Sequence, residues 1–429
     1  MLGLTKQLPL NCRCLRLYQL TRRFEPIAKT EKRSPSMKRS YLIVSIILLG
    51  VLCALGLKIG SGYVTGQDAA QKKNSAPANS TAEALYRGDA KAQKALADKV
   101  IADINRGINA SSFQTGNAQF NGEWAIGSYQ MAVLGLGQVI LAHPQLRDQY
   151  VPLMEQSVER LLTPENNRFG TEAWQENGLS SLDSANGHAY LGYTNLALSM
   201  LRLHKPDNRF SQINDQLTEA LVRRLTKAPH GMIETYPNEA YPADLAAVIG
   251  SIGLYDRATG KNHQALLAKL MLQFRQNLID PKTGLVFQAV DASSGTPVDQ
   301  PRSSGTALSA YFLSFANPEA AKVIFRGIPA KQKISLLGLV GIREYPQGQS
   351  GQGDIDSGPL VMGASSSATA FSLGAARLAG DKKLYRDLYQ TIKFLGNSPL
   401  GKMNGVSLVE SPLGNAILLT MLTAGDTPN

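Results

Sequence analysis

Three acidic side chains in polar segments of the chain have the clearest catalytic potential, Glu234, Asp183 and Asp356. Hydrolysis of a glycosidic bond uses two carboxyl groups, one that protonates the leaving oxygen and one that activates water or attacks the sugar. Glu234 is followed by Tyr236 and Pro237, which would shield its carboxylate from water and raise its pKa. We therefore predict Glu234 as the general acid, with Asp356 or Asp183 as the base.

The segments around these acids are rich in aromatic and polar side chains, including both tryptophans of the chain. Aromatic rings pack on the apolar faces of sugars, and carboxylates and Arg bind their polar edges. Such a mixture is typical of a saccharide site. The predicted substrate-binding residues are Trp124, Trp174, His188, Tyr236, Tyr241, Arg302, Glu344, Tyr345 and Asp354.

Several of these polar residues also fit a structural role. Asp183, Asp244 and Asp356 stand at predicted helix starts, where an Asp side chain caps free backbone N–H groups. His188 falls in the first turn of a predicted apolar helix, as a histidine of the core does. The sequence leaves both roles open for these four residues, whereas capping does not explain Glu234, which lies well ahead of the next helix.

Other chemistries lack their residues in this sequence. There is no HExxH or similar histidine pair for a metal and no Gly-x-Ser-x-Gly for a serine nucleophile, and the segment GQSGQGDIDSG lacks the Lys of a phosphate loop. We therefore predict neither a metal nor a cofactor. Arg302 is a candidate for holding an anionic group near a helix start, or it pairs with Asp299.

The elements that must position these residues repeat along the chain. Six segments rich in Gly, Ala, Leu and Ser start 60, 59, 61, 54 and 54 residues apart, and their low charge predicts helices buried on all sides. These predicted inner helices are Trp124 to Ala142, Ser184 to Leu203, Ala243 to Arg257, Ser304 to Ala316, Gly358 to Ala379 and Pro412 to Ala424.

Amphipathic segments alternate with the inner helices and predict outer helices, among them residues 146–162, 210–225, 263–278 and 382–395. Residues 82–108 provide the first, with Asp89 as an N-cap inside that range. Six pairs at this period indicate an all-α (α/α)6 toroid over residues 82–429, because helical solenoids have shorter repeats of about 33 to 47 residues. Since inner helices of a closed ring run parallel, the acidic entry loops should open on one face.

With the acidic entry loops and the segments YPNEAYPAD and DIDSGP in place, the body resembles the six-hairpin toroid enzymes. These include glycoside hydrolases, polysaccharide lyases and barrels of the linalool dehydratase-isomerase type. The resemblance covers about residues 82–425 at the level of architecture. It implies an active site in the funnel formed by the entry loops, commonly with Asp or Glu as general acid and base.

Three functions follow from these patterns. The first is a carbohydrate-active enzyme that hydrolyses a glycan with an Asp/Glu pair. The second is a non-catalytic cell-envelope protein that binds a glycan or another protein in the same funnel. The third is a lyase or isomerase acting on a small alcohol, with Tyr and His as acid and base, which requires a closed apolar pocket. The expected partner is thus a glycan or another small molecule, and the oligomeric state stays open.

The N-terminal segment predicts attachment to the inner (cytoplasmic) membrane. Residues 1–39 hold ten of the 44 Lys and Arg against two acidic residues, so this basic tail carries eight of the eleven net positive charges. Residues 40–58 then form a mostly apolar stretch whose uncharged part is 18 residues long, near the lower limit for a membrane-spanning helix. The excess of cations before it orients the tail to the cytoplasm. The nearly neutral remainder gives no support for binding nucleic acid.

We therefore expect a single-pass signal anchor, a flexible linker at residues 59–81, and a body facing the periplasm or cell exterior. A cleavable signal peptide starting at Met37 is the competing interpretation, since small residues at 60–62 suit cleavage. A lipoprotein is less favoured because Leu52 precedes Cys53. All three cysteines, Cys12, Cys14 and Cys53, lie in these N-terminal segments, so the exported body has no disulfide.

Overall fold

The computed structural model describes residues 80–183, 186–336, 338–403 and 406–425. The predicted tail and anchor lie outside the described residues, as does the linker up to residue 79. Within the described residues, one helix, Ala118–Ala142, is long and apolar enough to cross a membrane, with a mean hydropathy of 1.4 over its most apolar window. That window is 83% buried inside the body, so this helix is explained by its place in the core.

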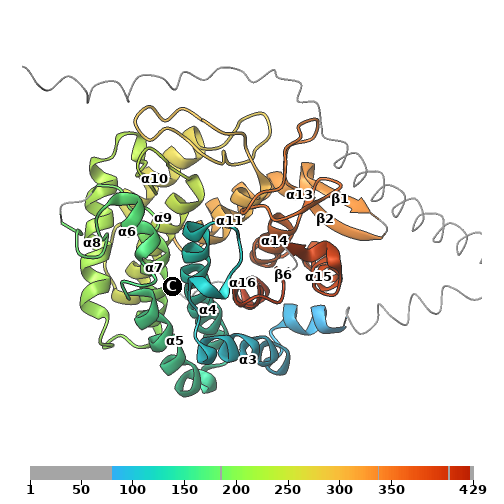
Figure 1. Ribbon diagram of the computed structural model, residues 1–429, viewed down its shortest axis with the longest axis horizontal. Helices are drawn as coiled ribbons and strands as arrows, with labels where there is room; N and C mark the ends of the chain where they lie inside the picture. Colours follow the sequence, from blue (N-terminus) through green and yellow to red (C-terminus); the bar gives the residue numbers. More distant parts are fainter. Residues whose placement is uncertain (1–79, 184–185, 337, 404–405, 426–429) are drawn as a thin grey trace, which may run out of the picture. The chain divides into compact units, whose positions relative to one another are not determined.

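Six inner helices form a closed ring. Each packs against the next in chain order, and the last packs back against the first. They are α4 (Ala118–Ala142), α7 (Leu191–His204), α9 (Pro242–Thr259), α11 (Ser303–Leu313), α14 (Ser366–Leu378) and α16 (Pro412–Thr423). In Figure 1 α4 lies between the green helices α7 and α9 and the red helix α16. The predicted (α/α)6 arrangement of inner helices is thereby confirmed.

The outer helices pack on the outside of this ring. They are α3 (Ala90–Arg106), α5 (Arg147–Leu161), α8 (Ser211–Lys227), α10 (Gln264–Asn277), α12 (Pro318–Phe325) and α15 (Lys382–Gly396). Residues 80–87 are also helical, and Asp89 caps α3 by accepting a hydrogen bond from the Ala92 N–H, as predicted. Shorter helices are α6 (Arg168–Trp174) and α13 (Gly327–Lys331).

Small residues let the inner helices approach closely. A Cβ on Gly250 would lie 2.2 Å from the carbonyl oxygen of Phe312, and one on Gly192 would lie 2.7 Å from the backbone nitrogen of Val248. Such contacts are impossible for a larger side chain, so glycine sets the spacing of α7, α9 and α11. This is why the inner helices have small and apolar residues on every face.

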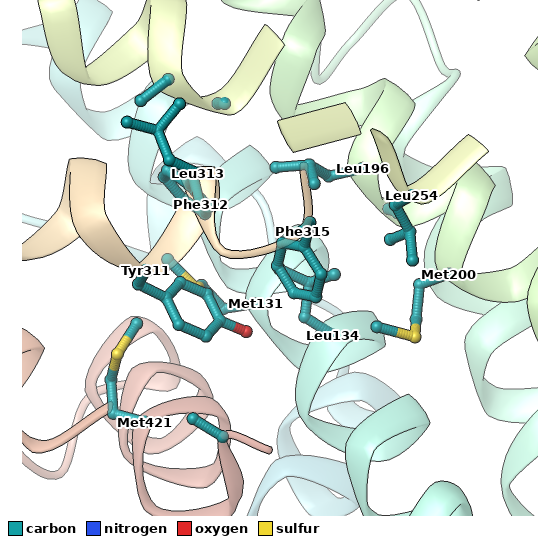
Figure 2. Close-up of a cluster of buried hydrophobic side chains, with 14 of the residues drawn as sticks. Met131, Leu134, Leu196, Met200, Leu254, Tyr311, Phe312, Leu313, Phe315 and Met421 are labelled. Carbon is teal, nitrogen blue, oxygen red and sulfur yellow. The ribbon is translucent and has the colours of Figure 1, made fainter. Parts of the chain in front are cut away.

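Large apolar side chains fill the centre of the ring. Figure 2 shows Tyr311, Phe312 and Phe315 packed among Met131 and Leu134, with methionine and leucine side chains of the neighbouring helices around them. All of these are buried, and the Tyr311 hydroxyl donates to Gln138 Oε1 at 3.0 Å. The core is therefore continuous from one inner helix to the next.

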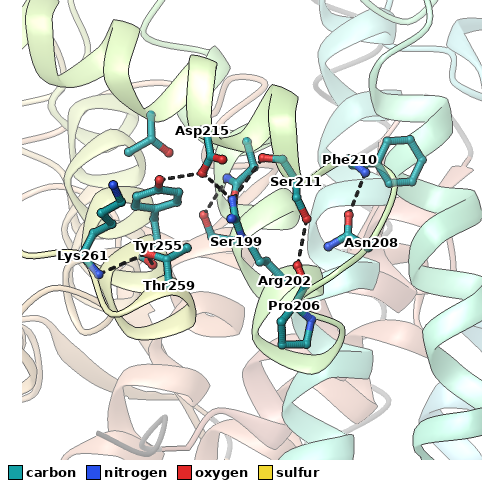
Figure 3. A network of polar contacts seen from close by, with 12 residues as sticks. Ser199, Arg202, Pro206, Asn208, Phe210, Ser211, Asp215, Tyr255, Thr259 and Lys261 are labelled. Carbon is teal, nitrogen blue, oxygen red and sulfur yellow. Dashed lines mark hydrogen bonds and ion pairs between the residues drawn. The ribbon is translucent and has the colours of Figure 1, made fainter.

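Polar networks tie the helices together at the carboxyl ends of α7 and α9. Figure 3 shows Asp215 of α8 accepting hydrogen bonds from Arg202 and from the Tyr255 hydroxyl, the latter at 2.6 Å. Arg202 also donates to the Ser211 carbonyl at 3.0 Å. These residues bond mainly to one another and to the backbone, so this end of the ring is held together by structural contacts.

Two small antiparallel sheets correct the expectation of a purely helical body. The first contains β1 (Lys333–Leu336), β2 (Leu339–Arg343), β4 (Ala364–Ser365) and β3 (Leu360–Val361) in that order, and the second pairs β5 (Lys402–Met403) with β6 (Val406–Ser407). Both lie in the long connections that enter α14 and α16. The strands explain why α14 begins at Ser366 and not near residue 358 as predicted.

Candidate active site

One cavity of about 470 Å³ opens among the amino-terminal ends of the inner helices. Each of the six inner helices contributes a residue from its first two turns, and the entry loops complete the lining. The contributing residues are Glu123 of α4, Tyr193 of α7, Asp244 of α9, Ser304 of α11, Ser366 of α14 and Leu413 of α16. The funnel is therefore where the parallel inner helices predicted it.

Glu123 is the best-positioned carboxylate of the cavity. Its Oε1 accepts a hydrogen bond of 2.6 Å from the Tyr236 hydroxyl and one of 3.3 Å from Gln119. Burial raises the pKa of Glu123 to about 7, against the lowering effect of the Tyr236 bond, and the nearby Asp244 charge adds to the increase. Its other oxygen, Oε2, accepts no hydrogen bond from the described residues and is available to a ligand.

Asp356 is the second carboxylate with an available oxygen. Gln288 donates to its Oδ2 at 2.9 Å, while Oδ1 has no donor among the described residues. The side chain stays open to the cavity, yet protein atoms surround it closely enough that desolvation raises its pKa to about 7, with the charges of Asp354 and Asp244 contributing. At neutral pH this group therefore carries a proton for part of the time.

Asp244 is fixed by two hydroxyl donors. Its Oδ1 accepts from Tyr193 at 2.6 Å and its Oδ2 from Thr235 at 2.7 Å. Burial raises its pKa, and these two bonds oppose the increase. Because both oxygens are occupied, Asp244 is better suited to shaping the electrostatics of the cavity than to transferring a proton.

Gln130 lies two helical turns beyond Glu123 on α4 and lines the same cavity. It is completely buried, and neither its amide nitrogen nor its amide oxygen has a hydrogen-bond partner among the described residues. Leaving a buried amide unsatisfied costs about 1–3 kcal/mol, so Gln130 lowers the stability of the fold in this arrangement. Because it is completely buried, the amide lies behind the cavity surface and is not exposed to a ligand.

Aromatic rings surround the acidic end of the cavity. Tyr190 and Tyr236 stack with ring centres 6.3 Å apart, and Phe169 packs on Tyr190 at 5.2 Å. Trp124 lines the cavity beside them. Phe169, Tyr190 and Tyr236 are themselves buried, so they form the aromatic support behind this end of the cavity.

The structure brings four of the predicted site residues into the cavity lining: Asp356, Trp124, Tyr236 and Tyr241. The other eight do not line it, namely Glu234, Asp183, Trp174, His188, Arg302, Glu344, Tyr345 and Asp354.

Neither Glu234 nor Asp183 lines the cavity with Asp356. The backbone carbonyl of Glu234 accepts from Ala189, and its half-buried side chain lies outside the cavity lining. Asp183 is fully exposed and pairs with Arg223 at 3.1 Å. It does not cap a helix, because α7 begins at Leu191 and not at Ser184 as predicted.

His188 precedes α7 and is not in its first turn, which corrects the predicted position. It has a positive φ of 66° and is fully buried, with its ring stacked on Trp174 at 4.4 Å. Burial, followed by the charge of Arg224, lowers its pKa to about 4. Trp174 in turn donates to the Thr235 carbonyl at 2.9 Å, so this pair holds the loop behind the cavity.

Arg302, Asp354 and Tyr345 form a cluster that supports the Asp356 turn. Arg302 bonds to Asp354 and to Asp299, the latter at 2.7 Å, which confirms the predicted Asp299 pairing. Asp354 accepts from the Asp356 N–H at 3.1 Å. The Tyr345 ring lies 5.5 Å from the guanidinium of Arg302. These residues position Asp356 without reaching the cavity.

Glu344 is completely buried and has a structural role behind the cavity. Ser304 donates to its Oε1 at 2.5 Å, and its backbone bonds to Ser303 and Gly363. Burial raises its pKa. It therefore joins β2 to the start of α11 and is not exposed to a ligand.

Glu123, Glu239 and Asp244 are carboxylates of the lining that are not among the site residues predicted from the sequence. Glu123 lies in the segment NGEW directly before the predicted first inner helix, and for Asp244 the sequence left capping and a functional role open. In the structure Glu123 and Asp244 occupy the first two turns of buried inner helices. An acidic residue at the start of a predicted buried helix was the available signal for Asp244. Across the described residues, no group of three or more His, Cys, Asp or Glu side chains is arranged to hold a metal ion.

The fold defines this chain as an (α/α)6 toroid, which confirms the architecture that the sequence resembles. No family model and no curated protein matches the sequence. Among solved structures, an inactive variant of an alpha-1,6-mannanase, GH76A of Salegentibacter sp., bound to alpha-1,6-mannotetrose is similar at 14% identity and a TM-score of 0.48, covering 77% of this chain and 98% of that chain.

Two further solved structures are similar at the same level. One is a candidate GH105 family member from Klebsiella pneumoniae, at 13% identity and a TM-score of 0.48 over 78% of this chain and 92% of that chain. The other is a GH76 alpha-mannanase of Bacteroides thetaiotaomicron, at 12% identity and a TM-score of 0.43 over 70% and 86%. No residue role is carried over from any of them.

Proposed function

We propose that this protein is a glycoside hydrolase that uses Glu123 and Asp356 as its carboxyl pair. The observation that carries the proposal is that both carboxylates line one cavity beside stacked aromatic rings, each with one oxygen that has no donor among the described residues. A non-catalytic binding protein would need the rings but not the two available acids. The pair replaces the predicted Glu234 and Asp183, which lie outside the cavity.

The hydrogen bonds around the two carboxylates distinguish their roles. Two donors at Glu123, Tyr236 and Gln119, stabilise its ionised form, so it is the base. Asp356 receives a single amide bond and has Asp354 and Asp244 as like-charged neighbours, which favours its protonated form and makes it the acid. With each pKa at about 7, the working combination of one ionised and one protonated carboxyl is populated near neutral pH.

The reaction balances with these two groups and one water. Asp356 gives its proton to the glycosidic oxygen as the bond between that oxygen and the anomeric carbon breaks. Glu123 takes a proton from the water whose oxygen bonds to the anomeric carbon. The products are a free sugar hemiacetal and an alcohol, and one proton transfer from Glu123 back to Asp356 through solvent restores the starting state.

The size of the cavity favours a short substrate. A volume of about 470 Å³ lies within the range of roughly 300 to 1,000 Å³ that is usual for small-molecule sites. It accommodates a small glycoside or the end of a longer chain. We therefore expect cleavage of small glycosides and not of the interior of a polysaccharide.

Turnover of a panel of nitrophenyl glycosides by four forms of the full-length protein tests the proposal. Glu123→Gln and Asp356→Asn should each lower kcat at least a hundredfold, because each removes one proton-transfer group. Glu234→Gln is the matched control and should keep activity. Loss of activity in Glu234→Gln alone would restore the sequence-based assignment, and absence of turnover of any glycoside by the unaltered protein would reject the hydrolase.

A lyase or isomerase acting on a small alcohol is the second candidate, and the apolar part of the cavity wall favours it. Its Tyr and His pair is incomplete here, since several tyrosines line the cavity but His188 does not. Product analysis separates the two reactions, because only hydrolysis incorporates oxygen from labelled water into the sugar.

We also propose that the helical body works outside the cytoplasm, held by a single-pass anchor at residues 40–58. The basic tail before that apolar segment supports this orientation. Alkaline phosphatase fused after Ser80 should be active, and a cytoplasmic reporter at the same place should be inactive. The opposite pattern would reject the exported location.

A further inference from the structure

The cavity has two chemically different walls. Three of the four acids, with the Tyr193, Tyr236 and Tyr241 hydroxyls, come from α4, α7, α9 and the loop that precedes α9, while Asp356 comes from the connection before α14. Most of the rest of the lining comes from α14, α15, α16 and the segment before α16, and apart from Ser366, Ser367 and Ser411 this wall is mainly aliphatic and aromatic. Its large side chains are Phe371, Ile392, Leu408, Val409, Leu413, Ile417 and Leu418.

Most of this apolar wall keeps surface open to the cavity. Phe371, Leu413, Ile417 and Leu418 are only partly buried, although they belong to helices of the inner ring. Exposing such side chains to water costs free energy that an apolar ligand group recovers by covering them. A sugar alone, with hydroxyls around its edge, would leave this wall uncovered. The wall therefore fits an aliphatic part of the ligand.

The charged residues of the lining restrict the polar part of the ligand. They are all acidic, namely Glu123, Glu239, Asp244 and Asp356, and no Lys, Arg or His occurs among the described residues that line the cavity. Arg302 does not offset this negative charge, because its guanidinium pairs with Asp299 and Asp354 outside the lining. A uronate, sulfate or phosphate group would meet only like charge here.

We propose that the substrate is a neutral glycoside with an aliphatic aglycone. The sugar lies against Glu123, Tyr236 and Asp356, and the aglycone lies along Leu413, Ile417 and the other side chains of the apolar wall. This inference rests on the proposed hydrolase function and adds the class of substrate. Cleavage releases the aglycone as an alcohol on the apolar side and the sugar on the acidic side.

Binding of short alkyl glycosides to the full-length protein tests this inference. Methyl, butyl, hexyl and octyl β-D-glucosides, and the corresponding α-D-mannosides, are titrated below their micelle concentrations and followed by calorimetry. In at least one series the affinity should rise roughly fourfold for each methylene that reaches the wall. Octyl β-D-glucuronide should bind at least tenfold more weakly than octyl β-D-glucoside, because its carboxylate faces the acidic residues.

Variants of the wall show where the alkyl chain binds. Leu413→Asn should remove most of the gain in affinity from methyl to octyl glycoside and should lower the affinity for the methyl glycoside by a much smaller factor. Leu272→Asn on α10, where the side chain is 54% exposed on the outside, is the matched control and should change neither. If Leu413→Asn fails to fold, as judged by circular dichroism, Leu413→Ala keeps the wall apolar and should lower octyl affinity by a smaller factor.

The outcomes separate the inference from the function on which it rests. Affinity that does not change with chain length, or glucuronide binding as tight as glucoside binding, overturns the inference even if nitrophenyl glycosides are cleaved. If octanol binds as tightly as octyl glycoside and no glycoside is cleaved, the cavity is an apolar binding site and the hydrolase function is rejected. A chain-length dependence retained in full by Leu413→Asn would place the alkyl chain elsewhere and also overturn the inference.

Discussion

The hydroxyl of Tyr236 donates a hydrogen bond of 2.6 Å to Oε1 of Glu123, although the two residues are 113 positions apart in the chain. The bond joins the loop before α9 to the second turn of α4 at the acidic end of the cavity. It stabilises the carboxylate against the desolvation that raises its pKa to about 7. The position and the charge of the proposed base thus depend on a contact between the first and third helix pairs.

Removing this hydroxyl should shift the pH dependence of activity. Because Glu123 and Asp356 each have a pKa of about 7, the wild-type rate should peak near pH 7 and fall on both sides. In Tyr236→Phe the pKa of Glu123 rises further, since a bond to its charged form is lost. The acidic limb of the kcat profile should therefore move to higher pH by about one unit, while the alkaline limb stays in place.

Tyr241→Phe is the matched control for this shift. Its hydroxyl donates at 2.8 Å to Glu239, a carboxylate that has no assigned role in proton transfer. In the kcat profile of this variant, both the acidic and the alkaline limb should stay at their wild-type pH. An unchanged profile in Tyr236→Phe would mean that Glu123 is not the base.

Gln130→Met should stabilise the protein and leave its activity unchanged. The buried amide has no partner among the described residues, so replacing it with an apolar side chain of similar size should raise the free energy of unfolding by about 1 kcal/mol. Because the side chain is completely buried, a substrate does not reach the amide, and KM and kcat should keep their wild-type values. Chemical denaturation and steady-state kinetics measure both properties.

Gln138→Met, on the same helix α4, provides the contrast. Its amide donates to the Thr420 carbonyl at 2.9 Å and accepts from Tyr311, so the substitution leaves buried groups unpaired. It should lower the free energy of unfolding by about 1–3 kcal/mol. Equal destabilisation of both variants would show that Gln130 has a structural partner.

Arg302→Met should destabilise the protein and reduce turnover. Arg302 is 9% exposed and pairs with Asp299 and Asp354. Its loss therefore leaves two carboxylates without their positive partner at a partly buried position. We expect a loss of about 2–3 kcal/mol in the free energy of unfolding, somewhat less than for a fully buried pair. Turnover per folded molecule should also fall, because Asp354 holds the turn that carries Asp356.

Arg209→Met is the control for a lost ion pair. Arg209 and its partner Glu159 have side chains that are 58% and 57% exposed, so this change should cost less than about 0.5 kcal/mol. If Arg302→Met proved no more harmful than Arg209→Met, Arg302 would have no positioning role.

His188→Asn should reduce the sensitivity of the fold to acid. The folded pKa of His188 is lowered to about 4, whereas the unfolded value is about 6.5, so the unfolded state binds the proton first as the pH falls. Wild-type stability should therefore decline between about pH 6.5 and 4 by roughly 2 kcal/mol from this residue alone. Asparagine tolerates the positive φ and does not titrate, so the variant should lose that part of the decline.

His230→Asn is the matched control, because His230 also has a positive φ, of 55°, but is exposed. Its stability should follow the wild-type pH dependence. Thermal unfolding measured at pH 7, 5.5 and 4 compares the three proteins. A wild-type decline preserved in His188→Asn would mean that other buried groups, such as His204, account for it.

The sequence predicted most of the fold because helix pairs leave a local signal. A helix buried on all sides must be apolar and small, as in the segment that became α9, and an outer helix must be amphipathic, as in the segment that became α15. Both properties recur with the period of the repeat. The predicted helix boundaries differ from the structure where loop residues form backbone hydrogen bonds of their own. The β3 and β4 hairpin is an example, because it occupies residues predicted as helical and α14 begins only at Ser366.

The sequence also located the funnel, since parallel inner helices must bring their entry loops to one end, and it placed Asp356, Trp124, Tyr236 and Tyr241 there. Which carboxylates line the same cavity was decided only by the tertiary structure. Glu123 and Asp356 are 233 positions apart, and their availability to a ligand depends on which hydroxyl and amide donors reach each of them. Glu234 and Asp183 stand in equally acidic loops but do not line the cavity, because the place of a side chain depends on backbone angles and packing partners that lie far away in the chain.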